Sequence, residues 1–464
     1  MTITPLQFFL IALTIAIALG GGIWAARSVK SAEGFSVGGR SAGVPLIAGT
    51  IAGTCVGGGA TVGTAQLAAT IGLSAWWFTI GTGISLIIMG LFYARPMRRA
   101  RLETISQYLV LNYGKRSGTF TSVVSSLGIF FSAVASALPA IAILAVVFSL
   151  PLWVAALLMT ALVSCYCFFG GLKSAGIGGI VKMIAIWLTL FLAGAAAFYS
   201  IRTDAAMQAA LPAFPWFSLL GNGVENALTN LFSLLVGVLC TQSYLQAVFS
   251  ASNPRTASIG AFAAALIVIP VGLPCAMIGM YMHAAHPEVA PLMALPTYLL
   301  TYQPVLIGSI AMGGIILSLV GSIAGLSLGI GTMLTEDIFA KVFHVESGKS
   351  KLMLERFVIL GVIAAALLTA LLNQGSQVLF WNYASMALRG GGIFLPMTFA
   401  LFFPHAFDSR YALASMILST GTAIAATILG SPVNPLFLGL GISLLVLLPG
   451  FRRNRPARPE TAFD

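Results

Sequence analysis

About thirteen apolar runs, each close to the length needed to cross a bilayer, follow one another along this chain. The chain is 58% hydrophobic and only 8% charged, whereas charged residues make up about 25% of a typical soluble protein. We therefore expect an all-α polytopic membrane protein with about thirteen transmembrane helices. The connections between the runs are too short to form a soluble domain with its own core.

The distribution of basic residues predicts the orientation of the chain. If the amino terminus lies outside, all of the 23 Lys and Arg residues except Arg202 and Arg389 fall in inward-facing segments. The positive-inside rule then places the carboxyl terminus in the cytoplasm, which requires an odd number of spans. The net charge of +11 thus reflects topology, and we expect no nucleic-acid partner. We expect a multi-pass protein of the cytoplasmic (inner) membrane, with the lipid bilayer as partner, as a monomer or weak homo-oligomer.

The segment Ile51–Thr61 interrupts one of these apolar runs with glycines at 53, 57, 58 and 59. Each glycine disfavours the helix by roughly 1 kcal/mol. Freed backbone groups are tolerated inside a membrane only where they line a cavity or are buried in protein. Broken transmembrane helices of this kind are typical of solute and ion sites in secondary transporters.

The order of the spans predicts an internal symmetry. Two stretches of about five spans begin on opposite sides of the membrane and each opens with an interrupted helix, the second near 237–244, which permits an inverted repeat. The expected units are an extra helix and loop at 1–34, a first repeat at 35–200, a second repeat at 201–404, two further helices at 405–451, and a basic cytoplasmic tail at 452–464.

Several motifs, taken in order, carry a resemblance to a known family. They are Gly38-Gly39-Arg40-Ser41, Phe92-Tyr93-Ala94-Arg95-Pro96-Met97-Arg98, Tyr113-Gly114-Lys115-Arg116, Phe169-Gly170-Gly171-Leu172-Lys173, Gln242-Ser243-Tyr244-Leu245-Gln246 and Thr335-Glu336-Asp337-Ile338-Phe339. From about 35 to 404 the chain resembles the solute:sodium symporters, and this resemblance implies the 5+5 inverted-repeat fold of the leucine transporter.

Within that family, Val56-Gly57-Gly58-Gly59 with Gly63-Thr64-Ala65 is most similar to the high-affinity choline branch. In that branch, Cys55 and Thr241 correspond to tryptophans that resemble the walls of a cage for quaternary ammonium. Each aromatic face contributes about 0.5–2 kcal/mol to such a cage. Because both faces are missing here, we expect a different substrate on the same scaffold.

The resemblance also implies a coupling sodium ion. Its ligands would be the carbonyls of Gly53, Val56 and Ser318, together with hydroxyls at positions 321 and 322. Ser322 supplies one hydroxyl, but residue 321 is glycine. A hard cation needs about six oxygen ligands, so water, Ser327 or Thr54 would have to replace the missing one.

Lys182 is a second departure from the family pattern. Family members commonly carry a Thr-Asp pair near the sodium exit path, where this chain has Gly178-Gly179 and then Lys182. In some sodium-independent relatives of the leucine-transporter fold, a basic side chain on this helix occupies the sodium position, and Lys182 can do the same. The alternative is that Lys182 extends to the inner headgroups. No acid or histidine lies in the middle of a span, so Lys182 is also the candidate for proton coupling.

Arg389 lies well inside an apolar run without an acid in the membrane to pair with it. Inserting such a charge costs roughly 2.5–3.5 kcal/mol, so it should have a partner. A carboxylate or phosphate of the solute could bind it in bidentate fashion. Alternatively, its guanidinium bonds to carbonyls freed by Gly390–Gly392, or reaches interfacial water.

Other polar residues fall on helices expected to surround a central cavity. The predicted solute ligands are Thr54, Cys55, Gln66, Thr241, Gln242, Tyr244, Asn382 and Arg389, with Thr61, Ser132, Ser136 and Tyr383 as weaker candidates. Polar residues in spans often only hydrogen-bond neighbouring helices, which is the alternative for each.

These features predict a secondary transporter that couples sodium ions to the symport of a small organic solute by alternating access, with a carboxylate-bearing solute preferred. One alternative is a sodium-independent or proton-coupled transporter in which Lys182 replaces the ion. Another is a transporter-like membrane sensor. An intramembrane enzyme would need a nucleophile with a base, or metal ligands, within the spans, so we expect no catalytic residues.

Overall fold

The computed structural model describes residues 3–26, 32–168, 171–345, 348–431 and 433–451. Within these ranges the chain is almost entirely helical, and extended pairing is limited to two isolated bridges, Ala42 with Ala251 and Phe407 with Phe451. The predicted all-α architecture is therefore confirmed. The predicted basic tail, the topology markers Arg27 and Lys30, and the first two residues of the 169–173 motif lie outside the described residues.

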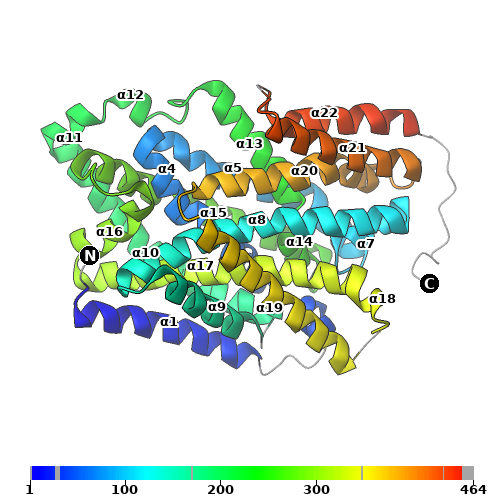
Figure 1. Cartoon of the computed structure of the whole chain (residues 1–464), viewed down its shortest axis with the longest axis horizontal. Coiled ribbons are helices and arrows are strands. Elements are labelled where there is room, and N and C mark those ends of the chain that lie inside the picture. Colours follow the sequence, from blue (N-terminus) through cyan, green and yellow to red (C-terminus); the bar gives the residue numbers. More distant parts are fainter. Residues whose placement is uncertain (1–2, 27–31, 169–170, 346–347, 432, 452–464) are drawn as a thin grey trace.

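The longer helices run mostly along the long axis of the molecule, and a few cross it obliquely (Figure 1). They are α1 (Pro5–Ala26), α3 (Val44–Cys55), α5 (Trp77–Ile88), α8 (Lys115–Val147), α9 (Leu152–Phe168), α10 (Gly171–Thr203), α13 (Val224–Leu239), α15 (Pro254–Ala285), α17 (Val305–Leu334), α19 (Gly348–Leu372), α20 (Val378–Phe402), α21 (Ser409–Ile428) and α22 (Pro435–Leu447). Shorter helices include α2 (Ala32–Ser36), α4 (Thr64–Ile71), α6 (Ala94–Arg99), α7 (Ile105–Tyr113), α11 (Ala205–Ala210), α12 (Ala213–Trp216), α14 (Gln242–Phe249), α16 (Ala294–Thr297) and α18 (Ala340–Val342).

Length and composition identify the membrane-spanning elements. In the described part of the chain, eight helices are long and apolar enough to cross a membrane, and the bent pair α13 and α14 makes nine if it forms one span. Four shorter apolar helices, Pro5–Ile17, Val44–Cys55, Leu152–Phe168 and Pro435–Gly450, fall below that length. A polytopic membrane protein follows, while the expected total of about thirteen spans stays a prediction.

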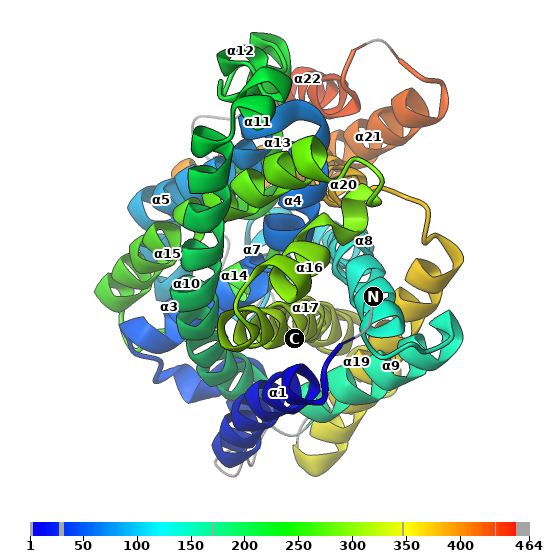
Figure 2. The ribbon, with the colours of Figure 1, turned by 90° about the vertical axis from the view of Figure 1, so that its left-hand side faces the viewer.

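The first and last helices define two opposite ends of the molecule. Helix α1 begins at the end that carries α11, α12 and α16, and α22 runs toward the end that carries α7 and α18 (Figure 1). Figure 2 looks along the helices from the first end and shows α17 near the middle, with α1, α15 and α21 at the periphery. The charge pattern assigns the segments that contain Arg40, Arg101 and Lys351 to the cytoplasmic side. Arg101 precedes α7 and Lys351 follows α18 along the chain. We therefore expect the end that carries α7 and α18 to face the cytoplasm.

Both predicted helix interruptions are present. Helix α3 ends at Cys55, Val56 is non-helical (φ −80°, ψ 78°), and the chain resumes in a π-helical turn over Gly59–Gly63. A Cβ at Gly58 would lie 2.8 Å from the carbonyl oxygen of Ala135, so only glycine allows α8 to approach this closely. The second break separates α13 from α14, which are bent by 48° relative to each other.

The two breaks organise the rest of the bundle. Helix α3 packs mainly on α10, and α17 lies against α10 and α8, so the first break faces the middle of the molecule. Helices α21 and α22 pack on each other and on α20. The division into repeats at 35–200 and 201–404, flanked by 1–34 and 405–451, stays a prediction.

Candidate functional site

The end of α3 exposes backbone carbonyls that its own helix does not use. The N–H of Val56 donates to the carbonyl of Ala52 at 2.8 Å, whereas the carbonyls of Gly53, Thr54 and Val56 accept hydrogen bonds from other helices. The negative end of the helix dipole lies at the same place. The break therefore favours a positive charge.

The ammonium of Lys182, on α10, supplies that charge. Its Nζ donates to the carbonyl of Gly53, and to the carbonyls of Val56 and Ser318 at 3.1 Å each. These are the three carbonyls that we expected around a sodium ion. An ammonium group has three donors, so the three carbonyls satisfy it fully, and Lys182 is only 1% exposed. With the ammonium there, the donor set does not fit a sodium ion, and Lys182 does not extend to the headgroups.

Glycines on facing helices explain why Lys182 reaches the break. A Cβ at Gly53 would lie 2.8 Å from the Cα of Gly179, and a Cβ at Gly179 would lie 2.1 Å from the carbonyl oxygen of Gly49. The backbones of α3 and α10 therefore touch, as small residues allow in membranes. Lys182 follows Gly179 by about one turn of α10, so its side chain lies next to the last turn of α3.

Gly321 leaves room for the same ammonium. A Cβ at residue 321 would lie 3.1 Å from the Nζ of Lys182, so the hydroxyl side chain expected in the family would compete with the lysine for space. Its neighbour Ser322 donates to the carbonyl of Thr54 at 2.7 Å and accepts from Ser136 at 3.2 Å. The missing hydroxyl at 321 and the lysine at 182 are thus two parts of one arrangement.

A small cavity adjoins the break. Its volume is about 20 Å³, which is room for about one water molecule. Residues of α3, α5, α8, α14, α17 and α20 and of the first helix break line it, including Gly57, Gly59, Phe78, Thr82, Ser132, Ser136, Ser322, Leu326 and Met386. Hydroxyl, amide, thiol and phenol groups dominate its polar wall, and none of its described lining residues is charged. An organic solute can enter only if the surrounding helices move apart.

Four of the eight predicted solute ligands line this cavity, namely Thr54, Cys55, Tyr244 and Asn382. The Tyr244 phenol lies beside the Cys55 thiol and joins the second helix break to the first. Of the weaker candidates, Ser132 and Ser136 also line the cavity, whereas Thr61 donates to the carbonyl of Gly57 and lies outside it.

Gln242 does not reach the cavity. Its Oε1 accepts from the N–H of Ile105 at 2.9 Å, and its Nε2 donates to the carbonyl of Glu103 at 2.7 Å. The side-chain amide therefore ties α14 to the start of α7. The expectation that Gln242 surrounds the cavity has to be corrected, because unpaired backbone groups at a helix start need a partner.

Gln66 and Thr241 also lie outside the cavity. The Oε1 of Gln66 accepts from the N–H of Val378 at 3.2 Å, in a separate crevice of about 300 Å³. Thr241 donates to the carbonyl of Gly237 at 2.8 Å and so completes the last turn of α13. Both residues lie next to a helix break in the sequence, but Gln66 bonds the start of α20 and Thr241 bonds the turn before it, so neither side chain faces the cavity.

Arg389 lies just beyond the cavity, on α20, one turn after Met386. It is 1% exposed, and its Nε and Nη1 have no hydrogen-bond partner in the described part of the chain. The ion pairs found among those residues do not include it. Its charge acts on Tyr244, Cys240 and Cys55, which places it beside the second break and the cavity wall. Those two nitrogens therefore do not bond the carbonyls of Gly390–Gly392.

Sequence reasoning missed Phe78, Thr82, Leu326 and Met386 in the cavity wall. Thr82 had a detectable signal, since it is a hydroxyl within an apolar run, and Phe78 precedes it by about one turn on the same face of α5. Leu326 and Met386 had none, because apolar residues in spans give no indication of whether they face lipid, protein or a cavity.

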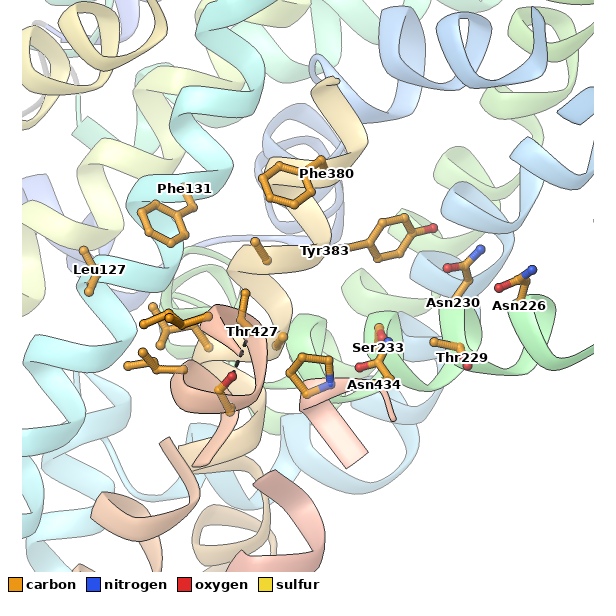
Figure 3. A pocket seen from close by; sticks show the side chains of 17 residues that line it. Leu127, Phe131, Asn226, Thr229, Asn230, Ser233, Phe380, Tyr383, Thr427 and Asn434 are labelled. Carbon is orange, nitrogen blue, oxygen red and sulfur yellow. Dashed lines mark hydrogen bonds between the residues drawn. The ribbon is translucent and has the colours of Figure 1, made fainter. Parts of the chain in front are cut away.

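A larger crevice lies elsewhere, between α8, α13, α20, α21 and α22. Its volume is about 610 Å³, and Figure 3 shows Tyr383 of α20 pointing toward Asn226 and Asn230 of α13, while Phe380 lies on the side of Phe131 of α8. Large apolar side chains at its edge are exposed, Phe380 by 60% and Ile428 by 78%. In a membrane such a surface faces lipid, so the small cavity at the breaks is the better candidate site.

Comparison with known proteins adds three findings. The model of the Sodium:solute symporter family matches residues 35–419. The high affinity choline transporter 1 of Homo sapiens is 28% identical over 56% of this chain and 47% of that protein. The same transporter of Mus musculus is 28% identical over 76% of this chain and 65% of that protein. The chain thus spans about half to two thirds of the length of these relatives.

A solved Na⁺-coupled sialic acid symporter, substrate-bound and outward-open, has a similar fold. The TM-score is 0.80 over 97% of each chain, with 16% sequence identity. This similarity confirms the predicted leucine-transporter-like fold. Because the identity is low, it carries no information about substrate or ion.

Proposed function

Because this chain belongs to the sodium:solute symporter family, we propose that it is a secondary transporter for a small organic anion in which Lys182 takes the place of the coupling sodium ion. Transport proceeds by alternating access, with the solute bound at the two helix breaks in the cytoplasmic membrane. The bound ammonium of Lys182 is the observation that carries the proposal.

The Lys182 contacts favour transport without sodium. A sodium ion in this position would have to displace an ammonium that is covalently attached and fully hydrogen-bonded to Gly53, Val56 and Ser318. Gly321 removes a ligand that the ion would use and makes the room that the ammonium uses. Both differences from the family pattern therefore disfavour sodium and favour lysine.

Two buried cations favour an anionic solute. Lys182 and Arg389 are each 1% exposed, and Nε and Nη1 of Arg389 lack partners in the described chain. A carboxylate can accept two parallel hydrogen bonds from a guanidinium. Binding would thereby relieve the cost of the buried charge.

The same charges disfavour choline, although the similar relatives are choline transporters. A quaternary ammonium needs several aromatic faces, and the cavity wall contributes only Phe78 and Tyr244. Arg389 would also repel it. We therefore propose that the scaffold is retained and the substrate is not.

Thermal unfolding of the purified protein in detergent tests the proposal. A panel of small carboxylates, amino acids, sugars and amines is measured in NaCl and in KCl at equal ionic strength. A ligand that binds only the native state stabilises it by about 2.7 kcal/mol at 100 times its Kd. We expect stabilisation by a carboxylate to the same extent in both salts.

Other results would contradict parts of the proposal separately. Stabilisation by a carboxylate in NaCl alone would restore the sodium-coupled symporter of the sequence prediction. Stabilisation by amines or neutral sugars, and not by carboxylates, would contradict the proposal that the solute is an anion. Uptake of the identified solute into proteoliposomes, with and without a sodium gradient, then distinguishes a transporter from a solute sensor.

Gly321→Ser is expected to destabilise the protein and to slow uptake severalfold. The new side chain begins 3.1 Å from the Nζ of Lys182 and displaces the ammonium from its carbonyls. Each weakened hydrogen bond of a charged group is worth about 1.5–3 kcal/mol. Gly361→Ser is the matched control, because a Cβ there meets nothing within 4 Å. Equal melting temperatures for the two variants would contradict the steric argument.

A further inference from the structure

Glu355 on α19 is buried without a countercharge. Its side chain is 0% exposed, its Oε1 accepts a hydrogen bond from the hydroxyl of Thr332 at 2.7 Å, and its Oε2 has no partner among the described residues. No basic group in the described ranges lies within ion-pair distance of it. An isolated ionised carboxylate in a dry site is far more costly than a neutral carboxylic acid.

A chain of hydrogen bonds connects Glu355 to both broken helices. Thr332 of α17 accepts from the Nε2 of Gln246 at 2.9 Å, and the same nitrogen donates to the carbonyl of Ser36 at 2.7 Å. Gln246 belongs to α14, the second half of one broken helix. Ser36 ends α2, which leads into the other, and its hydroxyl donates to Glu103 at 2.9 Å. Thr332 is near the end of α17 that leads to α18, and Glu103 precedes α7, so these hydrogen bonds lie toward the end that carries α7 and α18 (Figure 1).

The charged groups around Glu355 do not neutralise it. Those that act on it are Glu336, Glu103 and Lys351, together with Arg356 and the thiol of Cys167 on α9. The Lys351 ammonium is 2.7 Å from the Glu336 carboxylate and is thereby occupied. The Arg356 guanidinium lies over the rings of Phe35 at 5.6 Å and Phe168 at 4.9 Å.

Glu103, which lies outside the membrane-spanning segments, is a second buried acid at this end of the molecule. Burial, with the Glu336 carboxylate nearby, raises the pKa of the Glu103 carboxyl, although Ser36 and Arg40 act in the opposite direction. Of these two buried acids, Glu103 lies 3.8 Å from the guanidinium of Arg40, whereas Glu355 has no ion-pair partner among the described residues.

We propose that Glu355 is a proton-binding site whose occupancy holds closed the end of the molecule that we expect to face the cytoplasm. We take the form in which Gln246 bonds Thr332 as the closed one, and in it the carboxyl is neutral. When α14 moves away from α17, the bond between Gln246 and Thr332 breaks and water reaches Glu355. The proton then passes to that water, and reclosing takes one up again.

The sign of the pH dependence follows from this linkage. The closed form binds one more proton than the open form, so raising the pH favours the open form, by up to about tenfold per pH unit. Lowering the pH closes the gate. This inference requires an alternating-access transporter, but it does not depend on the roles of Lys182 or Arg389.

Cys167 provides a native reporter of opening. It is 4% exposed, it lies within electrostatic range of Glu355, and its Sγ is 3.7 Å from the carbonyl oxygen of Ala324. In a protein that retains only this cysteine, maleimide labelling is measured at pH 6 and pH 8. Dividing each rate by that of the unfolded protein at the same pH removes the ionisation of the thiol itself. We expect labelling to rise at least about tenfold with pH.

Glu355→Gln is expected to label slowly at both pH values, because the amide cannot ionise. Glu225→Gln is the matched control and should keep the pH response, because Glu225 is exposed in the first turn of α13 and does not act on Glu355. A Glu355→Gln protein that retains the full pH response would overturn the proposal.

If Glu355→Gln does not fold, Thr332→Val decides the question. It keeps the acid but removes the hydroxyl that donates to Glu355 and accepts from Gln246, so closing is weakened and labelling at pH 6 should be faster than in the wild-type protein while it still rises with pH. Labelling at the wild-type rate at pH 6 would overturn the proposal. Labelling needs no solute, so its outcome is separate from that of the transport assays.

Discussion

Replacing Lys182 by alanine is expected to reduce solute uptake in potassium medium at least about tenfold and to make the remaining uptake respond to sodium. The substitution removes the ammonium that donates to the carbonyls of Gly53, Val56 and Ser318, and of these the Val56 carbonyl keeps the hydroxyl of Ser318 as a donor. Each buried group left unsatisfied costs about 1–3 kcal/mol, and about 1.4 kcal/mol already corresponds to a factor of ten. Sodium can recover part of this loss, because the vacated position is surrounded by oxygen atoms.

The double variant Lys182→Ala/Gly321→Ser makes this prediction sharper. It removes the ammonium and restores a hydroxyl next to Ser322, so the site again has three carbonyls and two hydroxyls. We expect NaCl to raise its melting temperature relative to KCl by several degrees more than for Lys182→Ala alone. Gly321→Ser should therefore destabilise the protein when Lys182 is present and stabilise it in sodium when Lys182 is absent.

Lys173→Ala is the matched control, since it removes the other lysine of α10, which lies near Gly38. Its ion profile should equal that of the wild-type protein. If Lys182→Ala also keeps the wild-type ion profile and stability, the ammonium is not a substitute for the ion. Sodium-dependent uptake by the wild-type protein would lead to the same conclusion about the ammonium.

Apolar runs and glycines were sufficient to predict an all-α membrane protein with two interrupted helices, because these are local properties, whereas the leucine-transporter-like arrangement was implied only by the family resemblance. The glycines at 57, 58 and 59 locate the first break whatever packs around it. Helix length was less informative about the number of spans, since helices such as α3 and α9 are by themselves too short to cross the membrane.

The site was harder to predict, because side-chain direction depends on contacts between distant helices. Lys182 could extend to the headgroups or to the sodium position, and the contact of Gly179 with Gly49 and Gly53 decides between them. Gln242 lies at the second helix break, but its Oε1 accepts a hydrogen bond from the N–H of Ile105, and the side chain therefore does not face the cavity.

Glu355 was missed for a related reason. Lys349, Lys351 and Arg356 surround it in the sequence, which is typical of a solvated helix end. The structure shows that Lys351 pairs with Glu336 instead and that Arg356 lies over aromatic rings. Charge pattern indicates which side of the membrane a segment faces, but not which of its charges is left without a partner.

Arg389→Lys is expected to weaken binding of the anionic solute by about 10–100-fold while leaving expression and melting temperature nearly unchanged. Lysine keeps the charge but loses the planar fork that binds a carboxylate in bidentate fashion. A charge-assisted hydrogen bond is worth about 1.5–3 kcal/mol, which corresponds to this range. The measurement is the concentration dependence of thermal stabilisation by the carboxylate identified in the panel.

A neutral analogue of the solute separates recognition from structure. If Arg389 binds the carboxylate, the amide or ester analogue should bind the wild-type protein weakly and lose little further affinity in Arg389→Lys. If Arg389 only supports the second helix break, both ligands should lose affinity equally and the unliganded protein should melt lower. Arg202→Lys is the matched control, because Arg202 is exposed and lies over Phe198 and Phe217 instead. An unchanged affinity in Arg389→Lys would exclude Arg389 from the solute site and leave its burial to be explained by helix packing alone.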